Sequence, residues 1–202
     1  MTKVLVLGAN GQIAHWAIDL FLERGEVKLT LFCRRAKRLQ QYAGNPLVEV
    51  VEGDVLDAQA LATVMPGHDV VYANLAGDLV QMAWTIVITM KGARLKRLVF
   101  ISSMGIYNEV PGAHYDKALD PYRDAAAVIE SSDLDYTILR PSWLSNRDEI
   151  EYGITQKGED FRFSGDLVSR KSVADLVVQL ATVPGMETRR SLGVHRDVGH
   201  GR

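Results

Sequence analysis

The start of this chain limits the possible folds more than any other segment. It has a short apolar segment, then a glycine turn, then a helical pattern. Residues 3–7 read Lys-Val-Leu-Val-Leu, residues 8–14 read Gly-Ala-Asn-Gly-Gln-Ile-Ala, and apolar residues then recur at helical spacing through Phe21. One glycine permits a tight turn, a second permits close approach of a phosphate, and a small alanine permits close helix–strand packing. Free N–H groups at a helix start favour an anion. The pattern predicts a site for a dinucleotide pyrophosphate, with contacts from Gly8, Asn10, Gly11, Gln12 and Ile13.

Strand-like and helical patterns alternate along the rest of the chain. The expected strands are 3–7, 27–33, 47–51, 69–73, 97–102 and 136–140. The expected helices are 12–24, 36–42, 57–64, 79–93 and 119–132, and a capping pattern at Ser172-Val-Ala-Asp175 predicts a last helix to about Ala181. Alternation with Val/Leu/Ile-rich strands predicts an α/β fold: a Rossmann-like, doubly wound parallel sheet flanked by helices. With 202 residues and no linker or repeat, residues 1–202 are expected to form a single domain.

The segment 145–170 departs from this alternation. It is polar around Lys157-Gly158-Glu159-Asp160 and follows the last expected major strand. We therefore expect a short strand ribbon or a flap on the substrate side of the domain. The tail 198–202 is expected to fray.

Composition and charge exclude several classes of protein. A formal net charge of −2 gives no global attraction to nucleic acid or to anionic membranes. The one cysteine, Cys33, excludes an intrachain disulfide framework and favours a cytoplasmic location, and no cleavable signal opens the chain. The apolar stretch 79–90 is shorter than the roughly 20 residues of a membrane span, so we expect a buried helix or a homodimer seam there. The histidines lack metal-ligand spacing, so no metal is expected.

A basic cluster predicts which dinucleotide binds. NAD-binding relatives of this motif carry an acidic residue about 20 positions after the glycines, at the end of the second strand. This chain instead reads Phe-Cys-Arg-Arg-Ala-Lys-Arg over 32–38, with no Asp or Glu between Val27 and Val48. Guanidinium groups suit a 2′-phosphate, so we expect NADP(H), held by Arg34 and by Arg38 one turn later. The alternative is a solvated run of charge with no ligand.

Two further strand ends carry candidate cofactor contacts. Asp54 and Val55 follow the third strand, where a carboxylate can accept from the adenine amino group or cap the next helix. Small residues follow the fourth strand and permit close approach to a ribose. This second set is Asn74, Leu75, Ala76 and Gly77.

These segments occur in the order found in the atypical short-chain dehydrogenase/reductases. Together with Phe100-Ile-Ser-Ser103 and Leu134-Asp-Tyr-Thr-Ile-Leu-Arg-Pro141, they make the chain resemble the NAD(P)-binding, NmrA-like group, which includes the flavin reductase/biliverdin-IXβ reductase type. The resemblance covers roughly residues 3–181 and implies that Ser103 faces the nicotinamide and substrate. It also implies that the segment from Pro141 through Leu144, after the sixth strand, lies beside the nicotinamide. Pro141, Ser142 and Trp143 are its candidate cofactor contacts.

One departure from the larger short-chain enzymes bears on the chemistry. They use a Tyr-x-x-x-Lys pair to exchange a proton with the substrate. Here no tyrosine has a lysine four residues later, and Ala126 stands at that position after Tyr122. The sequence therefore favours an NADPH-dependent reductase of planar acceptors that stabilise their own charge, such as flavins, quinones or tetrapyrroles. Ser102 and Ser103 are the candidates for orienting the acceptor, and Tyr107 and Tyr122 for donating a hydrogen bond.

A non-catalytic NADP(H)-sensing regulator fits the same residues. A sugar-nucleotide epimerase is disfavoured, because it also depends on the Tyr/Lys pair and usually has a larger substrate domain.

Overall fold

The computed structural model describes residues 1–159, 161 and 165–197. Its central sheet has the order β3-β2-β1-β4-β5-β6-β10-β8. Neighbouring strands are parallel, except that β8 runs antiparallel to β10. The strands are β1 (Thr2–Leu7), β2 (Val27–Cys33), β3 (Val48–Glu52), β4 (Val70–Ala73), β5 (Arg97–Ile101), β6 (Asp135–Pro141), β8 (Gly153–Gln156) and β10 (Arg190–His195).

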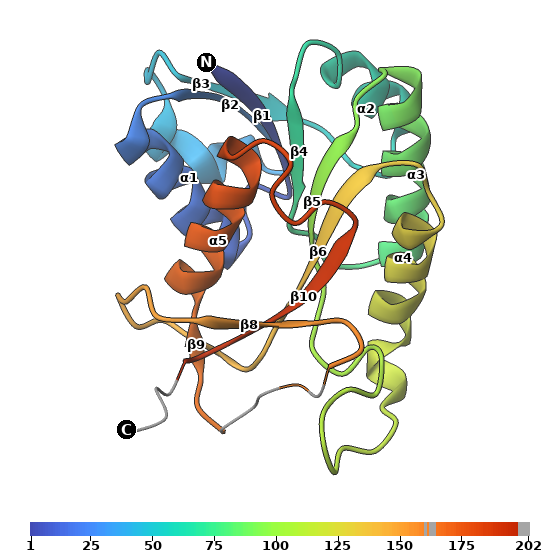
Figure 1. Cartoon of the computed structure of the whole chain (residues 1–202). Helices are drawn as coiled ribbons and strands as arrows, with labels where there is room; N and C mark the ends of the chain where they lie inside the picture. Colours follow the sequence, from blue (N-terminus) through green and yellow to red (C-terminus); the bar gives the residue numbers. More distant parts are fainter. Residues whose placement is uncertain (160, 162–164, 198–202) are drawn as a thin grey trace.

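Helices cover both faces of this sheet (Figure 1). On one face, α1 (Gln12–Arg24) packs beside α5 (Arg170–Thr182). On the other face lie α2 (Ala58–Val64), α3 (Leu79–Gly92) and α4 (Asp120–Glu130). The expected Rossmann-like α/β fold is therefore confirmed. The strands β2 and β3 lie on one side of β1, and β4, β5 and β6 lie on the other. The carboxyl ends of β1 and β4 therefore flank a topological switch point, where ligands bind in such sheets.

The strands form where the sequence has β-branched and apolar runs that can be buried on both faces. In β1, the four residues from Val4 to Leu7 are buried and alternate between the two cores. The α1 helix ends at Gly25, whose φ of 67° lets the chain leave the helix in the left-handed region. Among the other helices, Asp57, Asp78 and Ser169 accept backbone N–H groups as N-caps of α2, α3 and α5.

The structure corrects three details of the predicted elements. The segment 36–42 is a 3₁₀ helix, η1 (Ala36–Tyr42), with a kink at Leu39. The last helix begins at Arg170, because Ser169 rather than Ser172 is its N-cap: the Ser169 hydroxyl accepts from the Ser172 amide. The Ser172 hydroxyl instead accepts from the Glu151 amide. The strands β8 and β10 extend the sheet beyond β6; β10 was absent from the sequence prediction, whereas β8 falls in the segment 145–170, where a short strand ribbon was one of two expectations.

The described part of the segment 145–170 contains three short strands. The two-residue strands β7 (Leu144–Ser145) and β9 (Val168–Ser169) pair in parallel, and β8 joins the edge of the main sheet. Whether the segment covers a ligand stays a prediction, as does the frayed tail 198–202, which lies outside the described residues.

The outer face of α3 carries exposed apolar side chains. Trp84 and Ile88 are 46% and 63% exposed, so the homodimer seam stays a prediction for this face.

A short 3₁₀ helix, η2 (Lys117–Leu119), precedes α4. Over the described residues, no helix combines the length and the apolar content needed to cross a bilayer.

Candidate functional site: a nucleotide cleft

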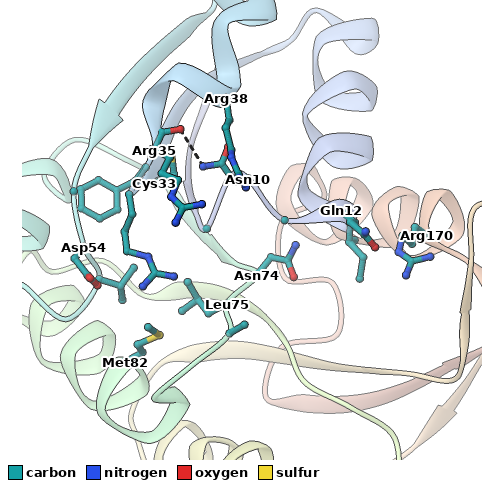
Figure 2. Close-up of a pocket in the computed structure, with 18 of the residues that line it drawn as sticks. Asn10, Gln12, Cys33, Arg35, Arg38, Asp54, Asn74, Leu75, Met82 and Arg170 are labelled. Atoms are coloured by element: carbon teal, nitrogen blue, oxygen red, sulfur yellow. Dashed lines mark hydrogen bonds between the residues drawn. The ribbon is translucent and has the colours of Figure 1, made fainter.

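A cleft of about 580 Å³ opens at the carboxyl ends of β1, β2 and β4. Its volume falls in the range of small-molecule sites. The residues that line it include the glycine turn, the basic segment after β2 and, from the far side, the start of α5 (Figure 2). The full lining is Gly8, Asn10, Gly11, Gln12, Ile13, Phe32, Cys33, Arg34, Arg35, Arg38, Gly53, Asp54, Val55, Asn74, Leu75, Ala76, Met82, Leu144 and Arg170.

The glycine turn packs directly against Asn74. Gly8 has a φ of +77°, and a Cβ there would lie 2.2 Å from the Asn74 carbonyl oxygen. A Cβ on Gly11 would lie 2.2 Å from Nδ2 of the same asparagine. Gly8 is therefore needed inside the protein, where the turn meets the main chain at the end of β4, whereas a side chain at Gly11 would displace the Asn74 side chain.

The first turn of α1 presents unused hydrogen-bond donors to the cleft. Its N-cap, Gly11, supplies no side-chain hydrogen bond, and no acidic residue lies in the first turn. The amides of Gln12, Ile13 and Ala14 find no acceptor within the described chain, and the first amide bonded in this helix is that of His15. Three free amides and the helix dipole form an anion-binding site.

Three arginines line the end of the cleft beyond β2. They lie on residues 34–38, a segment that runs into the first turn of η1 and is called the arginine loop. The Ala36 amide donates to Oε2 of Glu52 at 2.8 Å. Nδ2 of Asn10 donates to the carbonyl oxygen of Arg35 at 3.2 Å (Figure 2). Its Oδ1 is buried without a hydrogen-bond partner in the described residues. Arg34, Arg35 and Arg38 line the cleft here, and none forms an ion pair with a described carboxylate.

Asp54 lies at this end of the cleft, and its carboxylate also shapes the chain. Oδ1 accepts from the Leu56 amide at 3.0 Å, which stabilises the turn before α2. The cap of α2 is instead Asp57, which accepts from Gln59 and Ala60. The sequence leaves open whether Asp54 contacts the cofactor or caps the next helix. In the structure it lines the cleft and stabilises a turn, but it does not cap α2.

Leu144 and Arg170 form the other end of the cleft. Figure 2 shows Arg170 on the same side as Gln12 and away from Arg35, Arg38 and Asp54. Nη1 of Arg170 donates to Oδ1 of Asn146 at 2.9 Å. The resemblance places Leu144 beside the nicotinamide, whereas the sequence prediction missed Arg170, because α5 starts earlier than the capping pattern indicates.

Most of the predicted cofactor residues line this cleft. Those that do are Gly8, Asn10, Gly11, Gln12, Ile13, Arg34, Arg38, Asp54, Val55, Asn74, Leu75 and Ala76. Four others lie outside the lining: Gly77, Pro141, Ser142 and Trp143. Pro141 and Ser142 are buried, whereas Trp143 is 63% exposed. The sequence prediction also omitted Phe32, Cys33, Arg35, Gly53 and Met82; of these, Arg35 could have been found from the same basic run.

None of the four candidate catalytic residues lines the cleft. Ser103 donates its hydroxyl to the Met104 carbonyl at 3.2 Å, and the Ser102 hydroxyl is buried without a described partner. Tyr122 is half-buried and packs against the core under α3 and α4. These positions do not bring a hydroxyl to the lining of the cleft.

Tyr107 is bound into a separate polar network. Its hydroxyl donates to Oε1 of Glu130 at 2.8 Å and lies 3.2 Å from Oγ of Ser191 on β10. The guanidinium of buried Arg140, which pairs with Glu109, stacks over the Tyr107 ring at 5.1 Å. Burial raises the pKa of Tyr107 well above its ordinary value, with a further contribution from Glu130. This hydroxyl therefore stays protonated at neutral pH, and its hydrogen bonds lie within the protein.

The fold and the cleft define a nucleotide-binding, Rossmann-like α/β protein, in which uncapped amides and unpaired arginines fit a phosphorylated dinucleotide. The profile of the NAD(P)H-binding family matches residues 8–184, and the chain belongs to this family. In the described residues, no group of three or more His, Cys, Asp or Glu side chains is placed to hold a metal ion.

Solved structures and a curated relative agree with this assignment. A Rossmann-fold NAD(P)-binding family protein from Shigella flexneri is 38% identical, with a TM-score of 0.88 and coverage of 100% of this chain and 97% of that chain. A wide-type short-chain dehydrogenase/reductase from Veillonella parvula DSM 2008, in complex with NADP, is 27% identical, with a TM-score of 0.89 and coverage of 99% and 97%. The uncharacterized sugar epimerase YhfK of Bacillus subtilis (strain 168) is 24% identical over 205 residues, covering 93% of this chain and 91% of its own. The resemblance to atypical short-chain dehydrogenase/reductases is thereby confirmed.

Proposed function

We propose that this protein is an NADPH-dependent reductase of planar or conjugated acceptors, such as flavins, quinones or linear tetrapyrroles. One observation carries the proposal. The cleft presents anion-binding groups along its length, yet its described lining contains no tyrosine, lysine or histidine. Its ionisable side chains are the four arginines, Asp54 and Cys33. A cleft of this kind favours an acceptor that delocalises the new negative charge and takes its proton from water.

The preference for NADPH over NADH rests on the arginine loop. A 2′-phosphate carries negative charge that a guanidinium binds through parallel hydrogen bonds. At the end of β2 the chain offers Arg34, Arg35 and Arg38. The nearby carboxylate of Glu52 accepts from the Ala36 amide and so supports this loop.

The residues of the chain bind and orient the dinucleotide. The amides of Gln12, Ile13 and Ala14 suit the pyrophosphate, and the glycine turn lets it approach them. When bound, the reduced nicotinamide supplies a hydride, so the acceptor gains two electrons and one proton while a second proton comes from solvent. Precise positioning is therefore the main contribution expected of the protein.

Steady-state NADPH oxidation with a flavin, a quinone and a linear tetrapyrrole tests the proposal, beside titrations of NADPH and NADH. We expect turnover with at least one acceptor and NADPH binding at least about tenfold tighter than NADH binding. Tight NADPH binding without turnover on any acceptor would contradict the reductase and support the non-catalytic NADP(H)-sensing regulator. Tighter binding of NADH would overturn the role of the arginine loop.

The similarity to a protein named as a sugar epimerase raises a competing activity. Epimerases of the short-chain type depend on a proton-exchanging tyrosine, and the half-buried Tyr122 has Ala126 at the lysine position and lies outside the lining of the cleft. This arrangement favours the reductase.

A further inference from the structure

Arg170 is set apart from the other arginines of the cleft. Arg34, Arg35 and Arg38 belong to one loop after β2, whereas Arg170 is the first residue of α5. In Figure 2, Arg170 lies at the side of the cleft opposite Asp54. The cleft therefore offers positive charge at two separate places.

The pairing of neighbouring basic residues distinguishes Arg170 further. Lys171 forms an ion pair with Asp148 at 2.6 Å, and Arg196 forms one with Glu151 at 3.1 Å. Arg170 instead donates to the neutral amide of Asn146, and no described carboxylate lies within ion-pair distance of it. The amide orients the guanidinium without neutralising its charge, so its remaining N–H donors are available to an anion.

Other groups in the cleft suit the anionic groups of the dinucleotide. The arginine loop suits the 2′-phosphate, and the uncapped amides of α1 suit the pyrophosphate. A dinucleotide that extends from the arginine loop across the glycine turn directs its nicotinamide toward Leu144 and Arg170. The charge at this end is therefore placed beside the acceptor.

We propose that Arg170 binds a phosphate, sulfonate or carboxylate group of the acceptor, so that the preferred substrates are planar acceptors with an anionic substituent. This inference rests on the proposed reductase function and names the substrate class of the same site. Arg170 acts as a specificity-determining residue, because a charge-assisted hydrogen bond in a partly desolvated cleft favours the anionic acceptor over its neutral analogue.

Flavin mononucleotide and riboflavin provide a matched pair of probes, because they share the isoalloxazine ring and differ in one phosphate. We would measure kcat/KM with NADPH for each flavin, and the Kd of each flavin by fluorescence quenching in the presence of NADP⁺. The variants are Arg170→Gln and, as the control, Lys171→Gln, whose side chain lies outside the lining of the cleft. Thermal unfolding checks that both variants remain folded.

Wild-type protein is expected to prefer flavin mononucleotide by about tenfold in both measurements. Arg170→Gln should reduce this ratio to nearly one, and Lys171→Gln should keep it. A naphthoquinone and its sulfonated derivative should show the same pattern, which separates anion recognition from recognition of the ribityl chain.

Three results would overturn the inference. The first is an unchanged flavin ratio in Arg170→Gln, and the second is a wild-type protein that binds neither flavin. The third is an Arg170→Gln variant that loses NADP⁺ affinity by as much as it loses flavin affinity, which would assign Arg170 to the dinucleotide. Failure of the reductase function is distinct, since it abolishes turnover with every acceptor while the binding ratio still reports on Arg170.

Discussion

The two ends of the nucleotide cleft present the same chemical group with different support from the fold. At the β2 end, three arginines lie on residues 34–38, the arginine loop that runs into η1, and Glu52 and Asn10 hold its backbone through Ala36 and Arg35. At the α5 end, one arginine is oriented by the side-chain amide of Asn146. Several guanidiniums on a braced loop suit a doubly charged phosphate, whereas one guanidinium at the edge suits a single anionic substituent. In the proposed function, the β2 end recognises the cofactor and the α5 end recognises the acceptor.

Charge reversal at Arg34 should break the β2 end most strongly. We expect Arg34→Glu to weaken NADPH binding by about 100-fold and NADH binding by less than about threefold, because only NADPH carries the 2′-phosphate. Isothermal titration with both dinucleotides measures the effect. Lys37→Glu makes the same change of charge on the same loop outside the lining of the cleft, and serves as the control. Equal losses for the two dinucleotides in Arg34→Glu would show that Arg34 does not meet the phosphate.

Removal of the carboxylate that braces the loop should have a smaller effect. We expect Glu52→Gln to weaken the hydrogen bond from the Ala36 amide and to reduce NADPH affinity by about three- to tenfold. NADH affinity and the flavin ratio assigned to Arg170 should change little. Glu49→Gln, on the same strand and exposed, is the matched control. If Glu52→Gln strengthened NADPH binding, repulsion by the carboxylate would outweigh its support of the loop.

Removal of the Tyr107 hydroxyl, which lies outside the lining of the cleft, should produce the smallest effect. Tyr107→Phe removes hydrogen bonds to Glu130 and Ser191, so we expect a loss of about 1 kcal/mol in the free energy of unfolding. Because burial raises the pKa of this hydroxyl, it stays protonated up to strongly alkaline pH and should leave the pH profile of kcat unchanged. Chemical denaturation and steady-state rates between pH 6 and 9 test both statements. A shifted profile would restore Tyr107 as a proton donor.

Local patterns were sufficient to predict much of the fold. The strand before Gly8, the helix after Gly11 and the basic run after β2 follow from short-range periodicity and composition, and the structure has each of them. The strand β10, which follows α5 after a loop, was missed, and β8 was expected only as part of a strand ribbon or flap in the polar segment 145–170. Their pairing depends on contacts between segments far apart in the chain.

In the candidate site, too, local sequence predicted some features and long-range packing determined the others. The residues of the β2 end are close together in the sequence, so their proximity could be predicted without knowing the packing of α5. Ser103 and Tyr107 come from the expected strand end and the loop after it, yet their hydroxyls bond to the main chain at Met104 and to Glu130. Hydrogen-bond partners of this kind are set by side-chain orientation, which a sequence pattern does not specify.

The sequence by itself determined the class of fold, the glycine turn and the basic loop, because each depends on residues adjacent in the chain. Only the tertiary structure decided that Gly11 packs against Asn74 and that the amides of the first turn of α1 are free. It also decided that Arg170 closes the far end of the cleft, since Ser169 caps α5 and Asn146 orients the guanidinium. These features arise where separate βα units meet, and the packing of whole elements, not local propensity, sets those distances.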